Sequence, residues 1–148
     1  MIGVTREQIA VALFSLLQSM GPTVIKTYSR RPALWQQTTA MPALYMGNPM
    51  ENYVYQHGNA APAHVNLSFD IFIYINVAKD PNVIPDTVLN NLLDAVETTL
   101  GGFAVNGQPQ TLGGLVINTW IEGDIHRAPG YINGQGMCLF TVKCLVPS

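Results

Sequence analysis

The amino-acid sequence predicts an α+β fold: a mixed or antiparallel sheet of about four main strands, packed by two α-helices, with a protruding hairpin or long loop. Three observations predict it. Apolar residues recur at helical spacing in two segments, they alternate in one long segment, and turn residues separate these segments. The chain has 148 residues and no visible linker or repeat. We therefore expect residues 1–148 to form one domain.

The first predicted helix spans residues 5–20. Thr5 and Gln8 have the spacing of a capping box, and Gly21–Pro22 supplies a stop signal. The apolar positions between them are three or four residues apart, as on one face of a helix. They are Ile9, Leu13, Leu16, Leu17 and Met20.

The next part of the chain mixes short strand candidates with irregular segments. Residues 23–29 (TVIKTYS) predict a strand, and Pro32 with a polar run predicts irregular chain up to residue 40. Residues 42–46 are a short strand candidate. Residues 47–64 are rich in Gly, Asn and Pro around the motif YVY, which predicts either an extended hairpin or a long loop.

Residues 64–78 carry the clearest pattern of the chain, a long strand with an unbroken apolar face. A second helix follows from residue 85 to 100, with an apolar stripe, and Gly101–Gly102 ends it. Residues 115–125 and 136–146 predict two closing strands. Asn133–Gly134 is a tight-turn signal between them.

The composition is short of charge. Charged residues make up 11% of the chain, against about 25% in a typical soluble domain. Interface cores are depleted in charge, which favours an oligomer; the alternative is a monomer with a surface of Asn, Gln, Ser and Thr. The net charge is −2, and Arg30–Arg31 is the one adjacent basic pair, which argues against a nucleic-acid-binding surface.

The two cysteines, Cys138 and Cys144, lie on one face of the last predicted strand. At a rise of roughly 3.3 Å per residue they are about 20 Å apart, too far for a disulfide between them. We expect buried thiols in a reducing compartment. The apolar run at residues 9–17 is too short to span a bilayer, and Glu7 beside Arg6 spoils a signal peptide. We expect assembly in a cytoplasm.

Constellations for catalysis or metal binding are missing from the sequence. No G-x-S-x-G motif is present, and His57, His64 and His126 lack metal-ligand spacing. Glu122 and Asp124 alternate on a predicted strand, either as a functional acidic patch or as a solvated strand end. We expect no enzyme activity, no catalytic residue, no cofactor and no metal.

Aromatic residues outside the periodic segments indicate contact surfaces. Trp35 lies in a polar stretch, and Tyr53 and Tyr55 flank Val54 in the predicted hairpin. Such residues are typical interface anchors. The alternative for Trp35 is that it caps the edge of the sheet.

Several motifs, taken in order, resemble the tail terminator proteins of long-tailed bacteriophages. The second half carries SFDIFIYINV, a proline, the helix VLNNLLDAVETTL, then QTLGGLVINTWIEGDI and a closing strand. The first half carries RRP, Trp35 and MPAL. Each motif alone is weak, and their order and spacing carry the resemblance over roughly residues 5–147.

The resemblance implies a structural virion protein of the tail and neck. Six copies would form a ring at the head-proximal end of the tail tube, end tube polymerisation and join the tail to the neck. The partners implied are the chain itself as a homo-hexamer, the tail tube protein and a head–tail connector protein, with viral DNA passing through the lumen and no membrane. Glu122 and Asp124 are candidate lumen-facing residues. The candidate contacts with subunits, tube or neck are Arg30, Arg31, Trp35, Tyr53, Tyr55, His57, Arg127 and Tyr131.

Two kinds of alternative stay open. One is another head–tail connector or tail tube component; two well-marked helices argue against the all-β stoppers. The other is a small soluble enzyme or ligand-binding α+β domain, which needs a pocket with convergent polar groups.

Overall fold

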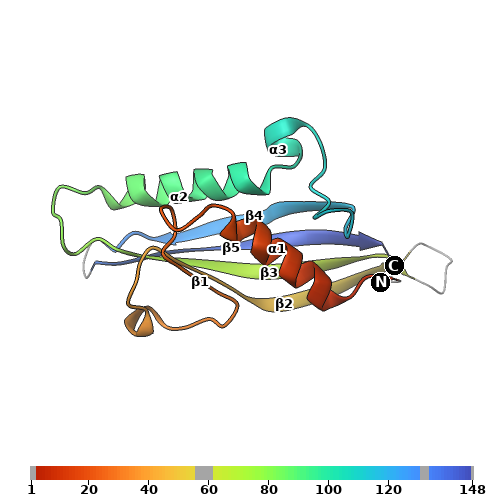
Figure 1. Cartoon of the computed structure of the whole chain (residues 1–148), viewed down its shortest axis with the longest axis horizontal. Coiled ribbons are helices and arrows are strands. Elements are labelled where there is room, and N and C mark those ends of the chain that lie inside the picture. Colours follow the sequence, from red (N-terminus) through yellow and green to blue (C-terminus); the bar gives the residue numbers. More distant parts are fainter. Residues whose placement is uncertain (1–2, 56–61, 131–133, 148) are drawn as a thin grey trace.

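The fold is α+β, as the sequence predicts: a five-stranded mixed sheet with two long helices on one face (Figure 1). The computed structural model describes residues 3–55, 62–130 and 134–147. The elements are α1 (Arg6–Gln18), β1 (Thr27–Ser29), the 3-10 turn η1 (Trp35–Gln37), β2 (Ala43–Tyr55), β3 (Pro62–Asn76), α2 (Pro85–Leu100), α3 (Phe103–Asn106), β4 (Asn118–Ala128) and β5 (Gln135–Pro147).

The strands lie in the order β1-β2-β3-β5-β4. β1 pairs parallel with β2, and the other neighbours are antiparallel. β1 is so short that it covers β2 only from Ala43 to Tyr45. Among the described residues, the sheet therefore has two long free edges, β4 on one side and the rest of β2 on the other.

Local signals place both helices where the sequence predicts them. The capping box of α1 is formed: Gln8 N–H donates to Thr5 Oγ1 at 3.1 Å, and Thr5 N–H donates to Gln8 Oε1 at 2.8 Å. α2 begins at Pro85, whose missing N–H costs nothing in a first turn. It ends at Gly101, whose φ of 65° favours glycine. None of the described helices is long and apolar enough to cross a membrane.

The core lies between the helices and one face of the sheet. Alternate residues of β3 and β5 point into it, and α1 and α2 contribute their apolar stripes. Cys138 and Cys144 lie on this face and are buried free thiols, as expected. The buried positions of the two central strands are Val65, Leu67, Phe69, Ile71, Ile73, Ile75, Cys138, Phe140, Val142, Cys144 and Val146.

The predicted strand at residues 23–29 is wrong for its first half. β1 contains residues 27–29, and a turn follows α1 instead. Ile25 N–H donates to Gly21 C=O at 3.3 Å, and the Ile25 side chain is fully buried in the core. Ile25 is thus a core residue that lies in a turn. The sequence pattern alone does not distinguish a buried residue in a turn from one in a strand.

The alternative of an extended hairpin is the correct one for residues 47–64. β2 runs unbroken from Ala43 through the YVY motif and pairs with β3, so the short strand candidate is its first part. A register shift between Gly47 and Met50 accommodates Asn48, whose φ is 48°. Residues 56–61 lie outside the described residues.

The fourth strand is displaced along the chain relative to the prediction of 115–125. Leu112, Gly113 and Gly114 have positive φ values and lie in a turn, and β4 begins afterwards at residue 118. A bulge between Glu122 and His126 then lets the strand continue to Ala128. Asn133 of the predicted tight turn lies outside the described residues.

Candidate interaction surfaces

The face of the sheet opposite the helices is open along much of its length. Polar side chains of β3 and β5 alternate there with the buried ones; examples are Asn66, Ser68 and Lys143, all partly exposed. Thr141 Oγ1 donates to Asp70 Oδ1 at 2.9 Å, and Asn48 Nδ2 donates to Asp70 Oδ2 at 3.3 Å. The open face thus carries polar side chains that form hydrogen bonds across its strands, next to apolar ones such as Phe72 and Leu139.

The loop after β1 covers one end of this open face and explains Trp35. The indole N–H of Trp35 donates to Ile75 C=O at 2.9 Å, and the ring packs beside Tyr45 and Tyr74. These two tyrosine rings lie 5.5 Å apart, and Tyr74 O–H donates to Ala33 C=O at 2.9 Å. Trp35 thus packs on one face of the sheet over β2 and β3, and not at the edge of the sheet as the alternative interpretation expected.

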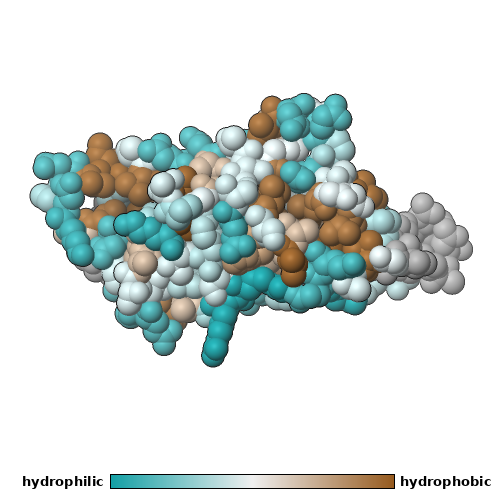
Figure 2. Space-filling model, in the orientation of Figure 1, coloured by the Kyte–Doolittle hydropathy of each residue, from teal (hydrophilic) through white to brown (hydrophobic). Residues whose placement is uncertain are grey.

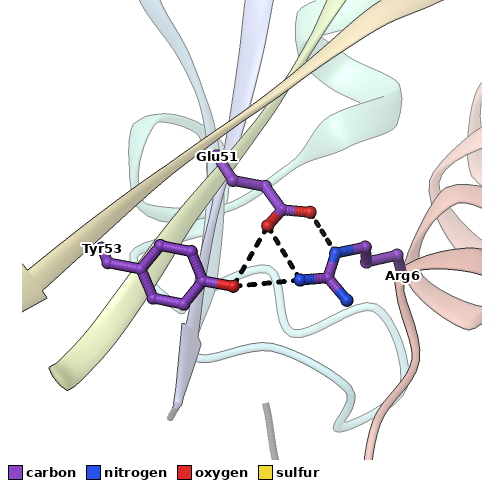
Figure 3. Close-up of polar contacts among 3 residues, drawn as sticks. All are labelled: Arg6, Glu51 and Tyr53. Atoms are coloured by element: carbon purple, nitrogen blue, oxygen red, sulfur yellow. Dashed lines mark hydrogen bonds and ion pairs between the residues drawn. The ribbon is translucent and has the colours of Figure 1, made fainter. Parts of the chain in front are cut away.

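Tyr53 belongs to a polar network that joins α1 to the free edge of β2 (Figure 3). The guanidinium of Arg6 donates two hydrogen bonds to the carboxylate of Glu51, and its Nη2 also lies 3.0 Å from Tyr53 Oη. Hydrogen bonds from Arg6 lower the pKa of Glu51 below its ordinary value, and the same contacts raise the pKa of Arg6. The network tethers the helix start to the hairpin.

The other candidate contacts near this edge are exposed. Arg30 pairs with Glu7 of α1, which lowers the pKa of Glu7 through the hydrogen bond between them. Arg31 is exposed without an ion pair to any described residue. Tyr55 is 59% exposed at the end of β2. His57 lies outside the described residues.

The remaining candidates lie on or beside β4. Arg127 Nη1 donates to Asn90 Oδ1 of α2 from the helix-covered side. Glu122 accepts from the indole of Trp120 and lies 3.8 Å from Lys143 Nζ across the strands. Tyr131 is outside the described ranges.

Glu122 and Asp124 do not lie on a regularly alternating strand, contrary to what the sequence predicts. Regular alternation would place both on one side of a strand. Gly123 has a φ of 75°, and the bulge that begins after Glu122 interrupts the alternation. Asp124 is exposed within this bulge.

A shallow hollow of about 390 Å³ lies between α3 and β4, and sequence reasoning missed it. Its lining is mostly apolar, with Glu97 as its one ionisable side chain. Phe103 and Ile125 line it and are 61% and 38% exposed. Hydrophobic surface is visible over α3 at the top of Figure 2. The available signal was the apolar pair Phe103 and Val105 directly after Gly101–Gly102, outside any periodic segment.

The described residues assemble little reactive chemistry. They contain no group of three or more His, Cys, Asp or Glu side chains that could hold a metal ion. Burial raises the pKa of Cys138 to about 12 and that of Cys144 to about 11, so both thiols are protonated and inert at neutral pH. What the surface offers is edges and patches for contact.

Compared with models of protein families and with curated proteins, the chain matches none of them.

Proposed function

We propose that this chain is the ring subunit of a bacteriophage tail terminator, which ends the tail tube at its head-proximal side and joins it to the neck. The ordered motifs described above support the proposal. The α+β fold supports it as well, because the resemblance implies a sheet backed by two helices and this chain has one. The low charge content fits a subunit that buries much of its surface.

The observation that carries the proposal is the pair of free and unlike edges of one sheet. β4 forms one edge, flanked by α2 and α3, and β2 beyond Tyr45 forms the other, flanked by α1. A closed ring needs a heterologous contact, in which two different surfaces of each subunit meet. Free strand edges left exposed are a liability in a monomer, and assembly covers them.

The open face of the sheet is the surface we assign to the lumen, where Glu122 lies. Among the described residues its charged groups include the pair Glu122 and Lys143, and the carboxylate of Asp70, which accepts hydrogen bonds from Thr141 and Asn48. A lining that is not net basic lets DNA pass without the counterion-release affinity of a basic channel.

Electron microscopy of the purified protein mixed with tail tubes tests the proposal. We expect a ring at one end of each tube and shorter tubes when the protein is present during tube polymerisation. Tubes of unchanged length with bare ends would contradict a terminator. Long tubes formed by the protein alone would instead identify a tube subunit.

The competing hypothesis of an enzyme or ligand-binding domain needs a hollow with convergent polar groups. The hollow at the start of α1 is lined by Arg6, Glu7, Arg30 and Glu51, and these four side chains form ion pairs with one another. In the hollow between α3 and β4, Glu97 is the one ionisable group, and no second acid, base or nucleophile converges on it. The hypothesis of a structural subunit that acts through its contact surfaces therefore has the stronger support from the described residues.

A further inference from the structure

The charged side chains are distributed unevenly between the two edges of the sheet, the β2 edge and the β4 edge. Residues 3–55, which form α1, β1, the following loop and β2, carry four basic and two acidic side chains. Residues 85–128, which form α2, α3 and β4, carry five acidic side chains and one basic. The part of the molecule at the β2 edge of the sheet thus has a net positive charge, and the part at the β4 edge has a net negative charge.

The charges without partners sharpen this asymmetry. Lys26 and Arg31 are exposed and form no ion pair with another described residue. On the opposite side Asp94, Glu97 and Asp124 are exposed and likewise form no ion pair within the described ranges. Each side therefore has charge that its own fold does not neutralise.

Apolar surface accompanies the charge on both sides. Leu34 follows Arg31 in the loop after β1 and is 63% exposed. Across the molecule, the hollow lined by Phe103 and Ile125 lies beside Glu97, with Asp124 next along the chain. The loop with η1 lies along the lower border of the molecule and α3 at the top (Figure 1). Contact between an exposed aliphatic side chain and an apolar hollow would remove apolar surface from water.

We propose that a second copy of this chain binds between these two surfaces. The basic edge of one copy (Lys26, Arg31 and Leu34) contacts the acidic hollow of the next, by which we mean the hollow lined by Glu97, Phe103 and Ile125 together with the adjacent Asp124. The inference rests on the proposed ring and names its lateral contact. Charge complementarity selects the occupant, because the surface that matches the acidic hollow is present on every other copy. Each copy then uses both surfaces, which is the condition for closing a ring.

Charge reversal tests the contact. The first variant, Lys26→Glu with Arg31→Glu, makes the basic edge acidic; the second, Glu97→Lys with Asp124→Lys, makes the hollow basic. All four positions are exposed, so both variants should keep the fold. We expect each variant alone to need at least about tenfold more protein for half-assembly in sedimentation velocity experiments. Added salt should weaken assembly of the native chain.

Mixing the two variants gives the sharper result. One variant then offers two acidic surfaces and the other two basic ones, so they should alternate and restore assembly with equal numbers of each. A chain carrying all four substitutions should also assemble alone. The control variant, Val11→Lys with Gln18→Lys, adds two positive charges to exposed positions of α1 and should assemble like the native chain.

Three results would overturn the contact. These are a native chain that stays monomeric up to about 1 mM, single-edge variants that assemble like the native chain, and variants that fail to rescue each other when mixed. Because the readout contains no tail tube, it separates the two proposals. A ring that forms through this contact but leaves tubes uncapped refutes the terminator and keeps the contact.

Discussion

The two faces of the sheet are built from alternate residues of the same strands, yet they differ in what covers them. On the helix-covered face Ile71 and Phe140 are almost completely buried. On the open face their chain neighbours Asp70 and Thr141 share a hydrogen bond and remain partly exposed. The difference teaches that one face holds the fold together, while the other is free to serve contact or passage.

Phe140→Ala should cause the largest loss of stability, because it leaves a cavity under the helices. Phe140 is 1% exposed, and such truncations cost about 3–5 kcal/mol. Urea unfolding followed by circular dichroism measures the free energy of unfolding. Leu139→Ala is the matched control on the open face, half-buried, and should cost less than about 2 kcal/mol. Equal losses would refute the contrast between the faces.

Trp35→Ala should have the next largest effect, because Trp35 secures the loop that covers one end of the open face. The change removes a hydrogen bond to Ile75 and half-buried packing, worth about 1–3 kcal/mol together. Trp35→Phe, which keeps most of the packing, should recover more than half of the loss in the same urea experiment. No loss in either variant would show that the loop contributes nothing to stability.

Thr141→Val probes the uncovered part of the open face. It removes the hydroxyl that donates to Asp70 at 2.9 Å and should cost about 0.5–1.5 kcal/mol. Thr141→Ser retains the hydroxyl and should stay nearer to the native free energy of unfolding. If serine and valine destabilise equally, the hydrogen bond does not stabilise the sheet.

Glu51→Gln should have the smallest effect, and that effect should depend on pH. Arg6 lowers the pKa of Glu51 below its ordinary value of 4.5, so the ion pair stabilises the folded chain above that value. The contribution is lost as pH falls through the lowered folded pKa. The melting temperatures of native and variant protein should therefore differ at neutral pH and converge in acid.

Arg6→Gln provides the control for this pH dependence. In its background Glu51→Gln should have little further effect, because the partner is already gone. A difference that persists unchanged in strong acid would contradict the assigned role of the pair.

The candidate contact surfaces were predictable only in part. The sequence singled out Tyr53 and Arg30, which lie exposed near the β2 edge, because large or charged side chains outside periodic segments are visible in one dimension. It did not identify the network of Arg6 and Glu51, since these residues are 45 positions apart. It also missed the hollow at Phe103, which exists only because α3 lies against β4.

By itself the sequence determined the local elements of this protein. Alternation placed β3, helical spacing placed α1 and α2, and the capping box of Thr5 and Gln8 fixed a helix start. These signals depend on residues within a few positions of one another, so they can be recognised in the sequence alone.

Tertiary structure alone decided how those elements meet. It set the strand order β1-β2-β3-β5-β4, turned Ile25 into a core residue within a turn, and interrupted β4 after Glu122. It also placed the basic and the acidic surface at opposite edges of one sheet. The reason is that strand pairing and burial depend on residues far apart in sequence, whose competition for one core no local pattern records.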